Sequence, residues 1–376
     1  MKKIGKQVAF LPTSQNNPRN GEGSFLRLAD GRIMYAYTEY YGDSWIDHAT
    51  ARISAIYSSD EGESWTAPSV LLEKGEHQQN VMSPSLIRLP NGKLGMVYLE
   101  KLEASPATSH CMPVFRYSDD EGKTFSGEIP MICERGYYVV NNDRIFVTKN
   151  GRILVPVAHH GDVYDHIQGL LLPARIRLFY SDDSGLTWGV LPGELYLAYS
   201  DAVGLQEPGV LELSDGTLWL YCRTAYGYQY HAFSHDGGHT FSTPEPNLFF
   251  TSPDSPMLMK QLSRGTVAVF NPNGFNCTVT HREIWGAPRR TPYILAVTDG
   301  DGSAFDNTKT KSIYGGFNPF VDTCYFLEDD TGESYCYPAV LEVEGGFLVA
   351  YYHSNGTGIC LNSTKITKVL YDEVSL

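Results

Sequence analysis

The sequence has little basic charge and no long apolar run. It contains 29 lysines and arginines against 43 aspartates and glutamates, which gives a formal net charge of −14. An acidic chain without clusters of lysine or arginine is a poor partner for nucleic acid, because neutralising phosphates requires clustered cations. No stretch approaches the roughly 18 consecutive apolar residues that a membrane-spanning helix needs. We therefore expect neither a nucleic acid nor a membrane as partner.

Paired cysteines and a leader segment are also lacking. The seven cysteines include no C-x-x-C pair, and the start, MKKIGKQVAF, has no apolar core of a secretory signal. We expect reduced, mostly buried thiols in a cytoplasmic protein. Secretion stays open in case a leader precedes the given start.

Motifs for common cofactors are absent as well. The sequence has no P-loop, no glycine-rich dinucleotide motif in a βαβ setting, no zinc-protease motif and no calcium-loop series, so we expect no cofactor. One segment combines histidine and aspartate, which are residue types that suit a divalent metal. Its members are His159, His160, Asp162, Asp165 and His166. Their spacing fits no metal-binding motif, so we interpret the segment as a solvated loop and predict no metal.

Aromatic residues and glycine are what the chain has in quantity. There are 25 tyrosines, 17 phenylalanines and 5 tryptophans beside 36 glycines and 21 prolines. This composition is typical of many short strands joined by tight turns. A hydrophobic share of 42% is enough to build a sizeable core.

Two independent repeats run through the sequence. The first is a turn motif, Ser-x-Asp-x-Gly-x-Ser/Thr-aromatic, with clear copies at 58–65, 118–125, 181–188 and 234–241 and a weaker one at 298–305. The second is a strand–turn–strand hairpin that occurs six times. Its turn glycines are Gly31, Gly92, Gly151, Gly216, Gly265 and Gly345. Asp-Gly and Asn-Gly between alternating β-formers are strong hairpin signals.

The repeats predict the architecture. Each hairpin, with a third strand and a turn, makes a unit of about 60 residues that cannot bury its faces alone, and radial stacking of four-stranded blades solves this. The sequence therefore predicts an all-β, six-bladed β-propeller of four-stranded antiparallel blades, in a single domain over residues 1–376. The last strand, near 365–371, is expected to pair with N-terminal residues and close the ring.

The turn motif resembles the Asp box of the sialidase (neuraminidase) superfamily, and the likeness covers nearly the whole chain. It implies a BNR-type propeller, nearer to the sialidase-like hydrolases of carbohydrate-degrading bacteria than to true sialidases. We expect the box residues themselves to be structural. The carboxylate accepts turn N–H groups, the glycine takes a positive φ, and the aromatic ring fills space between strands.

A propeller gathers the first strand of each blade around a central channel. Strand alternation is expected to place the start of each first strand and the end of each second strand on the rim opposite the turns, where function should lie. Polar and charged residues at these points suggest a site for a polyhydroxylated or acidic ligand. The candidates for substrate binding on this reasoning are Asp43, His48, Asn142, Asp143, His159 and Asp254.

The sialidase resemblance implies roles for five residues. The segment 205–208 and the hairpin after it resemble a sialidase blade that carries a glutamate and a carboxylate-binding arginine, which implies Glu207 and Arg223. Tyr337 falls where sialidases carry a tyrosine nucleophile, and Arg290 where a further clamp arginine is expected. Asp47 falls where they carry the aspartate that acts as acid and base.

These roles form a coherent mechanism, in which Asp43 is a close rival of Asp47. Glu207 would take the phenol proton of Tyr337, while Asp47 protonates the leaving oxygen. The two arginines would hold a substrate carboxylate through paired hydrogen bonds.

The start of the first blade departs from the superfamily. Sialidases carry Phe/Tyr-Arg-Ile-Pro there, whereas this chain reads GEGSF, with Glu22 about where the arginine stands. A glutamate repels a substrate carboxylate, which argues against sialic acid. It also leaves open that Glu22 and Asp47 are the working carboxylate pair, with Glu207 in support.

Three functions remain open at this stage. The leading hypothesis is a sialidase-like exo-glycoside hydrolase that cleaves a terminal, neutral or acidic, sugar from an oligosaccharide or glycoconjugate. One alternative is a polysaccharide lyase, in which Arg223 neutralises a uronate carboxylate. The other is a non-catalytic, carbohydrate-binding propeller. The sequence leaves the sugar, the stereochemical outcome and the oligomeric state undetermined.

Overall fold

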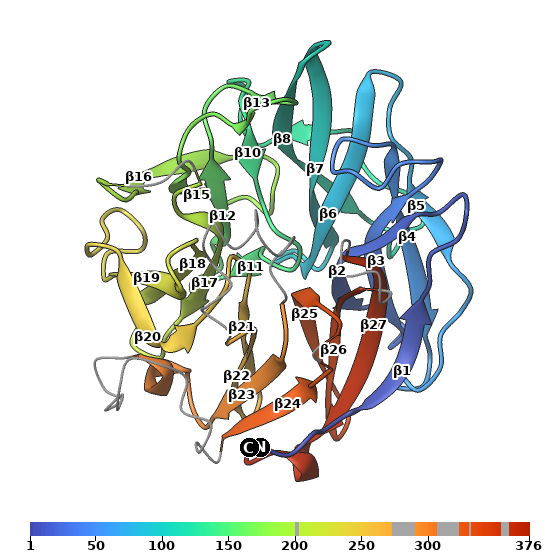
Figure 1. Ribbon diagram of the computed structural model, residues 1–376, viewed down its shortest axis with the longest axis vertical. Helices are drawn as coiled ribbons and strands as arrows, with labels where there is room; N and C mark the ends of the chain where they lie inside the picture. Colours follow the sequence, from blue (N-terminus) through green and yellow to red (C-terminus); the bar gives the residue numbers. More distant parts are fainter. Residues whose placement is uncertain (200–202, 273–289, 307–322, 331, 355–360) are drawn as a thin grey trace.

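The computed structural model describes residues 1–199, 203–272, 290–306, 323–330, 332–354 and 361–376. Six antiparallel β-sheets stand around a central axis like the blades of a propeller (Figure 1). The predicted all-β, six-bladed propeller is confirmed. Among the described residues the helical segments are two single 3₁₀ turns, Ser303–Phe305 and Tyr371–Glu373.

Each blade is a meander whose first strand lies innermost. Blade 1 holds β2 (Arg19–Arg27), β3 (Ile33–Tyr40), β4 (Ala51–Ser58) and β5 (Ser69–Leu72). Blade 2 holds β6 (Gln78–Arg88), β7 (Leu94–Ser105), β8 (Thr108–Ser118) and β9 (Ile129–Pro130). Blade 3 has an innermost strand in two pieces, β10 (Tyr138–Val139) and β11 (Phe146–Val147), followed by β12 (Ile153–His159), β15 (Arg175–Ser181) and β16 (Gly189–Leu195).

The remaining blades follow the same plan. Blade 4 holds β17 (Gln206–Glu212), β18 (Leu218–Arg223), β19 (Tyr228–Ser234) and β20 (Glu245–Thr251). Blade 5 holds β21 (Leu258–Leu262), β22 (Gly265–Phe270), β23 (Tyr293–Thr298) and β24 (Cys324–Glu328). Blade 6 holds β25 (Tyr335–Val343), β26 (Gly346–Ser354), β27 (Leu361–Leu370) and β1 (Lys6–Leu11). A short hairpin, β13 (Tyr164–Asp165) and β14 (Gly169–Leu170), leaves blade 3 and joins the sheet of blade 2.

The ring closes as the sequence predicts. The N-terminal strand β1 pairs antiparallel with the last strand β27, from Lys6 opposite Lys368 to Leu11 opposite Thr364. Because the first and last strands share one sheet, opening the ring requires breaking a ladder of backbone hydrogen bonds.

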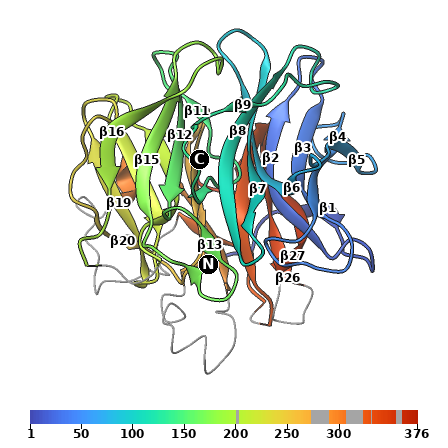
Figure 2. The ribbon, with the colours of Figure 1, turned by 90° about the horizontal axis from the view of Figure 1, so that it is seen from above.

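One rim of the propeller carries both predicted repeats. All six predicted hairpin glycines have a positive φ, between 75° and 155°. The turn motifs meet these hairpins, since the backbone N–H of Ala29 donates to Glu121 at 2.7 Å and that of Glu344 donates to Glu61 at 2.9 Å. In Figure 2 the strands run from one rim to the other, so the innermost strands, which end at the hairpins, start at the opposite rim.

The four clear turn motifs are closed by their own side chains. In the first, the Ser58 hydroxyl donates to Asp60 at 2.8 Å, and the N–H and hydroxyl of Ser64 donate to Asp60 at 2.9 and 2.6 Å. The weaker copy at 298–305 differs, because Gly300 stands where the other copies have the aspartate, and Gly302 opens a 3₁₀ turn. Asp301 still accepts the N–H of Ser214 in the neighbouring blade at 2.7 Å, as Glu121 accepts that of Ala29.

The core lies between neighbouring blades. Met34 and Ile53 of blade 1, for example, pack with Leu86 and Met96 of blade 2, and all four are buried. Burying such side chains from water is the main stabilising contribution to the ring. Within the described residues, no helix combines the length and hydropathy that crossing a membrane would require.

Candidate functional site

A repeated backbone irregularity aims side chains at the axis. Five blades have one non-glycine residue in the left-handed region near the start of the innermost strand, with φ between 47° and 56°. These residues are Glu22, Ser83, Asp143, Glu207 and Tyr337. In blades 1, 2, 4 and 6 the strand pairing skips this residue and the one after it, which is a β-bulge. Positive φ costs free energy for such residues and is concentrated at functional sites.

Four of these five left-handed residues line one cavity of about 290 Å³ at the channel mouth. We call this cavity the cup. Its charged or titratable lining includes Glu22, Asp47, Lys101, Cys111, Tyr137, His160, Tyr164, Glu207, Arg223, Arg290 and Tyr337. Its other lining residues are Met82, Ser83, Leu99, Val139, Asn141, Leu170 and Gln206. The cup therefore brings together residues from distant segments, including all four predicted catalytic residues.

The Glu207 carboxylate is the centre of the first polar cluster. The Tyr337 hydroxyl donates to it at 2.7 Å, and Nη1 of Arg223 donates to its other oxygen at 2.7 Å. Nε of Arg223 donates to Asp254 at 2.5 Å. Burial, with the charge of Glu207, raises the pKa of Tyr337 well above the ordinary value. The phenol is therefore neutral and needs a base, which Glu207 is in contact to supply.

Arg290 faces the same cluster from blade 5. Its guanidinium donates to the backbone oxygen of Asp254 at 2.8 Å and to the Cys336 sulfur at 3.0 Å. It lies 5.8 Å from the centre of the Tyr337 ring. Within the described part of the chain no carboxylate pairs with Arg290, whereas Arg223 is shared by two. Arg290 is thus the guanidinium whose charge is open to an acidic ligand.

Arg19 organises the second polar cluster. Its Nη2 donates to Glu22 at 2.8 Å, its Nη1 donates to Asp47 at 2.5 Å, and its Nε donates to the Tyr352 hydroxyl at 2.8 Å. Gly21 makes room for this arrangement, because a Cβ there would lie 1.9 Å from the Tyr352 ring. Arg19 is 8% exposed and holds both carboxylates from behind the cup.

The two carboxylates on Arg19 differ in proton affinity. Burial raises the pKa of Glu22, and the charge of Arg19 offsets this only in part. Protein atoms crowd Asp47 and oppose its ionisation, yet its side chain stays 60% exposed. The charges of Arg19 and Lys101 outweigh the crowding and hold the pKa of Asp47 below its usual range. Asp47 is the open carboxylate at the cup edge and Glu22 is the enclosed one.

Asp47 is held in place through its backbone. Nζ of Lys101 and the side-chain amide of Asn80 each donate to the Asp47 carbonyl at 2.9 Å. Arg19 also donates to the carbonyl of Trp45 at 3.2 Å. These contacts fix the backbone of the loop, and the contact from Arg19 fixes the carboxylate that the loop carries.

Six predicted site residues do not line the cup. Asp43 is exposed on the loop before Asp47, and His48 lines a neighbouring hollow. His159 stacks on Tyr138, with ring centres 4.3 Å apart. Asp254 lies behind Arg223. Strand starts and loop residues alternate in direction, so position along the chain alone did not separate facing from hidden residues.

The other two predicted site residues outside the cup, Asn142 and Asp143, connect neighbouring blades around the channel. The Asn142 amide donates to the Gly23 and Pro338 carbonyls at 2.8 and 3.3 Å, which ties blade 3 to blades 1 and 6. Asp143 accepts from Nζ of Lys260 at 2.8 Å and from the Val340 N–H at 3.0 Å.

Several cup residues were not among the site predictions. They are Ser83, Lys101, Tyr137, Asn141, His160, Tyr164 and Gln206, with Arg19 behind them. Burial lowers the pKa of His160 to about 4, so this ring is neutral at pH 7. Asn141 Nδ2 and Gln206 Oε1 are buried and have no hydrogen-bond partner among the described residues.

The histidine–aspartate segment 159–166 gathers no metal ligands. His160 faces the Leu172 carbonyl at 3.3 Å and His166 the Ser109 hydroxyl at 2.8 Å, so its members have separate partners. In the described ranges as a whole, no three His, Cys, Asp or Glu side chains are arranged to hold an ion.

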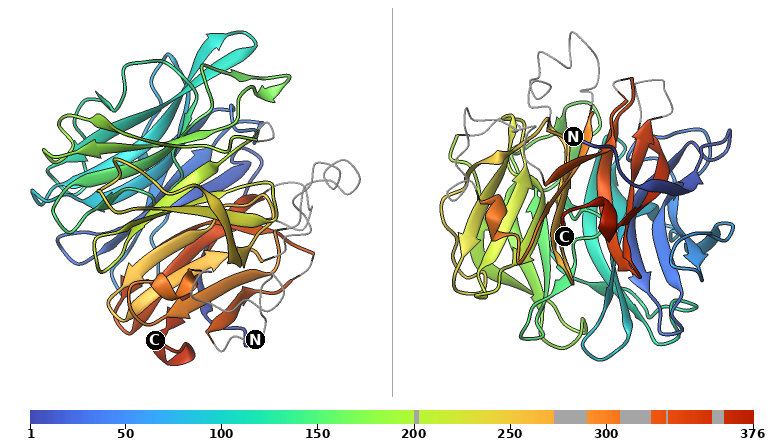
Figure 3. Two further views of the ribbon diagram at one scale, coloured as in Figure 1. Left: turned by 90° about the vertical axis from the view of Figure 1, so that its left-hand side faces the viewer. Right: turned by 90° about the horizontal axis from the view of Figure 1, so that it is seen from below.

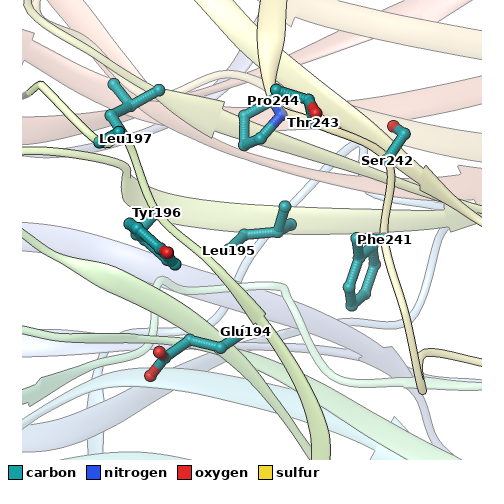
Figure 4. A pocket seen from close by; sticks show the side chains of 9 residues that line it. Glu194, Leu195, Tyr196, Leu197, Phe241, Ser242, Thr243 and Pro244 are labelled. Atoms are coloured by element: carbon teal, nitrogen blue, oxygen red, sulfur yellow. The ribbon is translucent and has the colours of Figure 1, made fainter.

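A second hollow, of about 330 Å³, lies at the outer edge between blades 3 and 4. Figure 4 shows it between Leu195 and Tyr196 on one side and Phe241 and Pro244 on the other. Its one acidic group, Glu194, is paired with Arg175 at 2.9 Å. This hollow offers shape but no free reactive group, in contrast to the cup.

Comparisons with known proteins support the propeller fold. The BNR repeat-like domain family matches residues 47–350. A comparison with curated protein sequences gave no match. Among solved structures, a protein of unknown function from Dyadobacter fermentans has a TM-score of 0.70 and 18% identity, over 97% of this chain and 99% of that one.

Two sialidase-type structures are similar over comparable lengths. The intramolecular trans-sialidase from Ruminococcus gnavus has a TM-score of 0.68 and 14% identity, over 98% of both chains. The NanB sialidase from Streptococcus pneumoniae has a TM-score of 0.68 and 11% identity, over 100% of this chain and 71% of that one. At such identities the likeness establishes the fold alone. With the four Asp boxes and the family match, the chain belongs to the BNR repeat-like domain family and has a sialidase-like propeller fold.

Proposed function

We propose that this protein is an exo-glycoside hydrolase that cleaves a terminal sugar from an oligosaccharide or glycoconjugate bound in the cup. One observation carries the proposal. The Tyr337 hydroxyl donates to the Glu207 carboxylate at 2.7 Å, and both residues are held on left-handed bulges that face the cavity. A nucleophile in contact with its base is the basic requirement of covalent catalysis.

The first step forms a glycosyl-enzyme. Glu207 takes the phenol proton, the Tyr337 oxygen bonds to the anomeric carbon, and the glycosidic bond breaks. Asp47 gives its proton to the leaving oxygen. The Asp47 side chain suits this role because it is 60% exposed at the cup edge, where a leaving group departs.

The second step releases the sugar. Asp47, now a carboxylate, takes a proton from water, and the water oxygen bonds to the anomeric carbon. The bond to Tyr337 breaks, and the phenol recovers its proton from Glu207. Because Asp47 must start protonated while Arg19 and Lys101 hold its pKa low, activity is expected to favour acidic pH.

One guanidinium of the cup favours an acidic terminal sugar. Glu207 and Asp254 both pair with Arg223, whereas Arg290 contacts the backbone oxygen of Asp254 and is the guanidinium available to a substrate carboxylate. Asn141 and Gln206 line the cup with side-chain amides, a group that suits sugar hydroxyls. Glu22, beside Arg19, disfavours a carboxylate on the blade 1 side of the cup.

The test is a screen of aryl glycosides, including a sialoside and a glucuronide, followed by Tyr337→Phe on the substrate that is cleaved. We expect loss of at least ~10³-fold in kcat, because the phenol oxygen is the nucleophile. A fluorinated, slowly turned-over analogue should leave a sugar adduct on Tyr337 that mass spectrometry detects.

Tyr351→Phe is the matched control. The Tyr351 hydroxyl also donates to a buried glutamate, Glu328, at 2.9 Å, but outside the cup lining. Its loss should leave kcat within about twofold. Near wild-type turnover by Tyr337→Phe would instead favour Glu22 and Asp47 as the working pair. An unsaturated uronate that absorbs in the ultraviolet would show a lyase.

A further inference from the structure

A separate hollow adjoins the cup. It measures about 500 Å³ and is lined by Trp45, Ile46, Asp47, His48, Gln79, Tyr164 and His166. We call it the shelf. Asp47 and Tyr164 line both cavities. A ligand that fills the cup and passes Asp47 therefore continues onto the shelf.

The outer wall of the shelf is built by a hairpin that changes blades. The hairpin β13–β14 follows β12 of blade 3, yet Tyr164 pairs with Ser109 and Asp165 with Thr108 on β8 of blade 2. The His166 N–H donates to the Ala107 carbonyl at 2.9 Å. The left panel of Figure 3 shows this green hairpin beside the long β7–β8 hairpin. The wall is thus anchored by backbone pairing.

Aromatic rings form the surface of the shelf. The His48 ring centre lies 4.5 Å from that of Tyr164 and 4.9 Å from that of His166. Trp45 is 44% exposed at the open side. The Ser109 hydroxyl contacts both Gln79 Oε1 and His166 Nε2 at 2.8 Å, which fixes two polar groups of the lining. Rings with a few placed polar groups are the usual surface for a sugar, whose apolar faces stack while its hydroxyls bind.

The shelf has little charge to offer an ionic ligand. Among the described residues that line it, Asp47 is the one carboxylate, and no lysine or arginine is present. Burial and the nearby Lys101 lower the pKa of His48 to about 3, so that ring is neutral. A sulfate, phosphate or carboxylate would meet Asp47 without a counter-charge, whereas a neutral sugar meets only rings and hydrogen-bonding groups.

We propose that the shelf binds the sugar residue that departs in the reaction, and that this residue is neutral. The inference rests on the proposed function, because it takes Asp47 at the junction as the proton donor to the bond between the two sugars. The substrate class follows: a glycan with a terminal sugar in the cup and a neutral second sugar on the shelf, rather than a simple alkyl glycoside.

The kinetic test compares two substrates with the same terminal sugar, a methyl glycoside and a lactoside. Trp45→Ala should lower kcat/KM for the lactoside about tenfold more than for the methyl glycoside, which is the size of a lost aromatic contact. The control is Tyr199→Ala, which removes an aromatic side chain that is 96% exposed and outside both cavities. An equal loss of kcat/KM on both substrates, or no loss on either, would contradict the proposal that the shelf binds the departing sugar.

A binding experiment tests whether the shelf binds a sugar, without requiring catalysis. Saturation-transfer NMR should show contacts from the wild-type protein to free lactose or cellobiose, and these should vanish in Trp45→Ala but remain in Tyr199→Ala. If the wild type cleaves no glycoside yet binds lactose in this way, the hydrolase proposal fails and the sugar-binding shelf stands. No transfer to either disaccharide in the wild type would overturn the shelf, whatever the protein hydrolyses.

Discussion

The two rims of the propeller use the same residue types in opposite ways. On the Asp-box rim, Asp60 is bonded by Ser58 and Ser64, within four residues of itself. On the cup rim, Glu207 is bonded by Tyr337, 130 residues away, and Glu22 by Ser83, 61 residues away. A carboxylate that its own turn satisfies can be repeated in any blade. A carboxylate satisfied only by other blades exists once, where the blades converge.

The proton affinities of the two rims differ in the same sense. Hydrogen bonds within the turn lower the pKa of Asp60 and of Asp120 alike to about 2. In the cup, burial raises the pKa of Glu22 while the charges of Arg19 and Lys101 lower that of Asp47. Identical shifts indicate a shared structural role, and divergent shifts on neighbouring carboxylates are what acid–base chemistry requires.

The largest loss of activity is expected from a substitution at the centre of the cup. Glu207→Gln should lower kcat by ~10²–10⁴-fold, because the amide cannot take the Tyr337 proton. The thermal midpoint should change little, because Asp254 still pairs with Arg223 at 2.5 Å. Steady-state kinetics and a melting curve of the same preparation check both.

Glu328 provides the matched control for this variant. It is bonded by the Tyr351 hydroxyl and by Nζ of Lys365, each at 2.9 Å, which repeats the tyrosine and the cation around Glu207 outside the cup. Glu328→Gln should keep activity within about twofold. Retained activity in Glu207→Gln together with a large loss of stability would assign Glu207 to structure.

A smaller effect is expected from Lys101, whose charge lowers the pKa of Asp47. Removing that charge raises the pKa of Asp47, so the acid stays protonated to higher pH. In Lys101→Met, the alkaline limb of the kcat/KM profile should move up by about 0.5–1 pH unit. Asn80 still holds the Asp47 carbonyl in this variant.

The charge-preserving variant tests the cause of that shift. Lys101→Arg should leave the alkaline limb of the kcat/KM profile at its wild-type pH, even if altered packing against Tyr137 lowers the rate. A limb that moves equally in both variants, or moves down in Lys101→Met, would show that another group controls the pH dependence.

Most of the fold was predictable because each blade contains short sequence motifs that can be recognised on their own. The hairpin glycines and the Asp boxes are short motifs whose hydrogen bonds close within the motif, so each copy can be recognised alone. The hairpin β13–β14 was not predictable in this way. It follows blade 3 in sequence but pairs with Ser109 of blade 2, and nothing in residues 164–170 encodes that choice.

The candidate site was predictable mainly where the sialidase resemblance implied a residue. Glu207, Arg223 and Tyr337 were implied in this way, and they line the cup. Arg19 lies three residues before the Glu22 bulge, and its part became visible only with Tyr352 and Asp47 in place.

A sequence signal for the bulges exists in retrospect. Three of the left-handed residues precede proline, in Ser83-Pro84, Glu207-Pro208 and Tyr337-Pro338. Proline has no N–H to give to a strand ladder, so it is tolerated at a bulge where pairing is skipped. A polar residue before proline at the start of an innermost strand therefore indicates a side chain aimed at the axis.

The smallest effect is expected on the other rim, where Asp120 closes a box with Thr124 and Ser118. Asp120→Asn should lower the thermal midpoint by a few degrees near neutral pH and keep activity within about twofold. The folded-state pKa of about 2 lies below the unfolded value near ~3.9, so the stabilisation is present above pH ~4 and is lost as the pH falls toward 2. The gap between the two melting curves should therefore narrow as the pH is lowered from 6 to 3. A difference in melting temperature that does not depend on pH would mean that the Asp120 charge contributes nothing to stability. A loss of activity comparable to that of Glu207→Gln would contradict the assignment of a structural role to this rim and a catalytic role to the other.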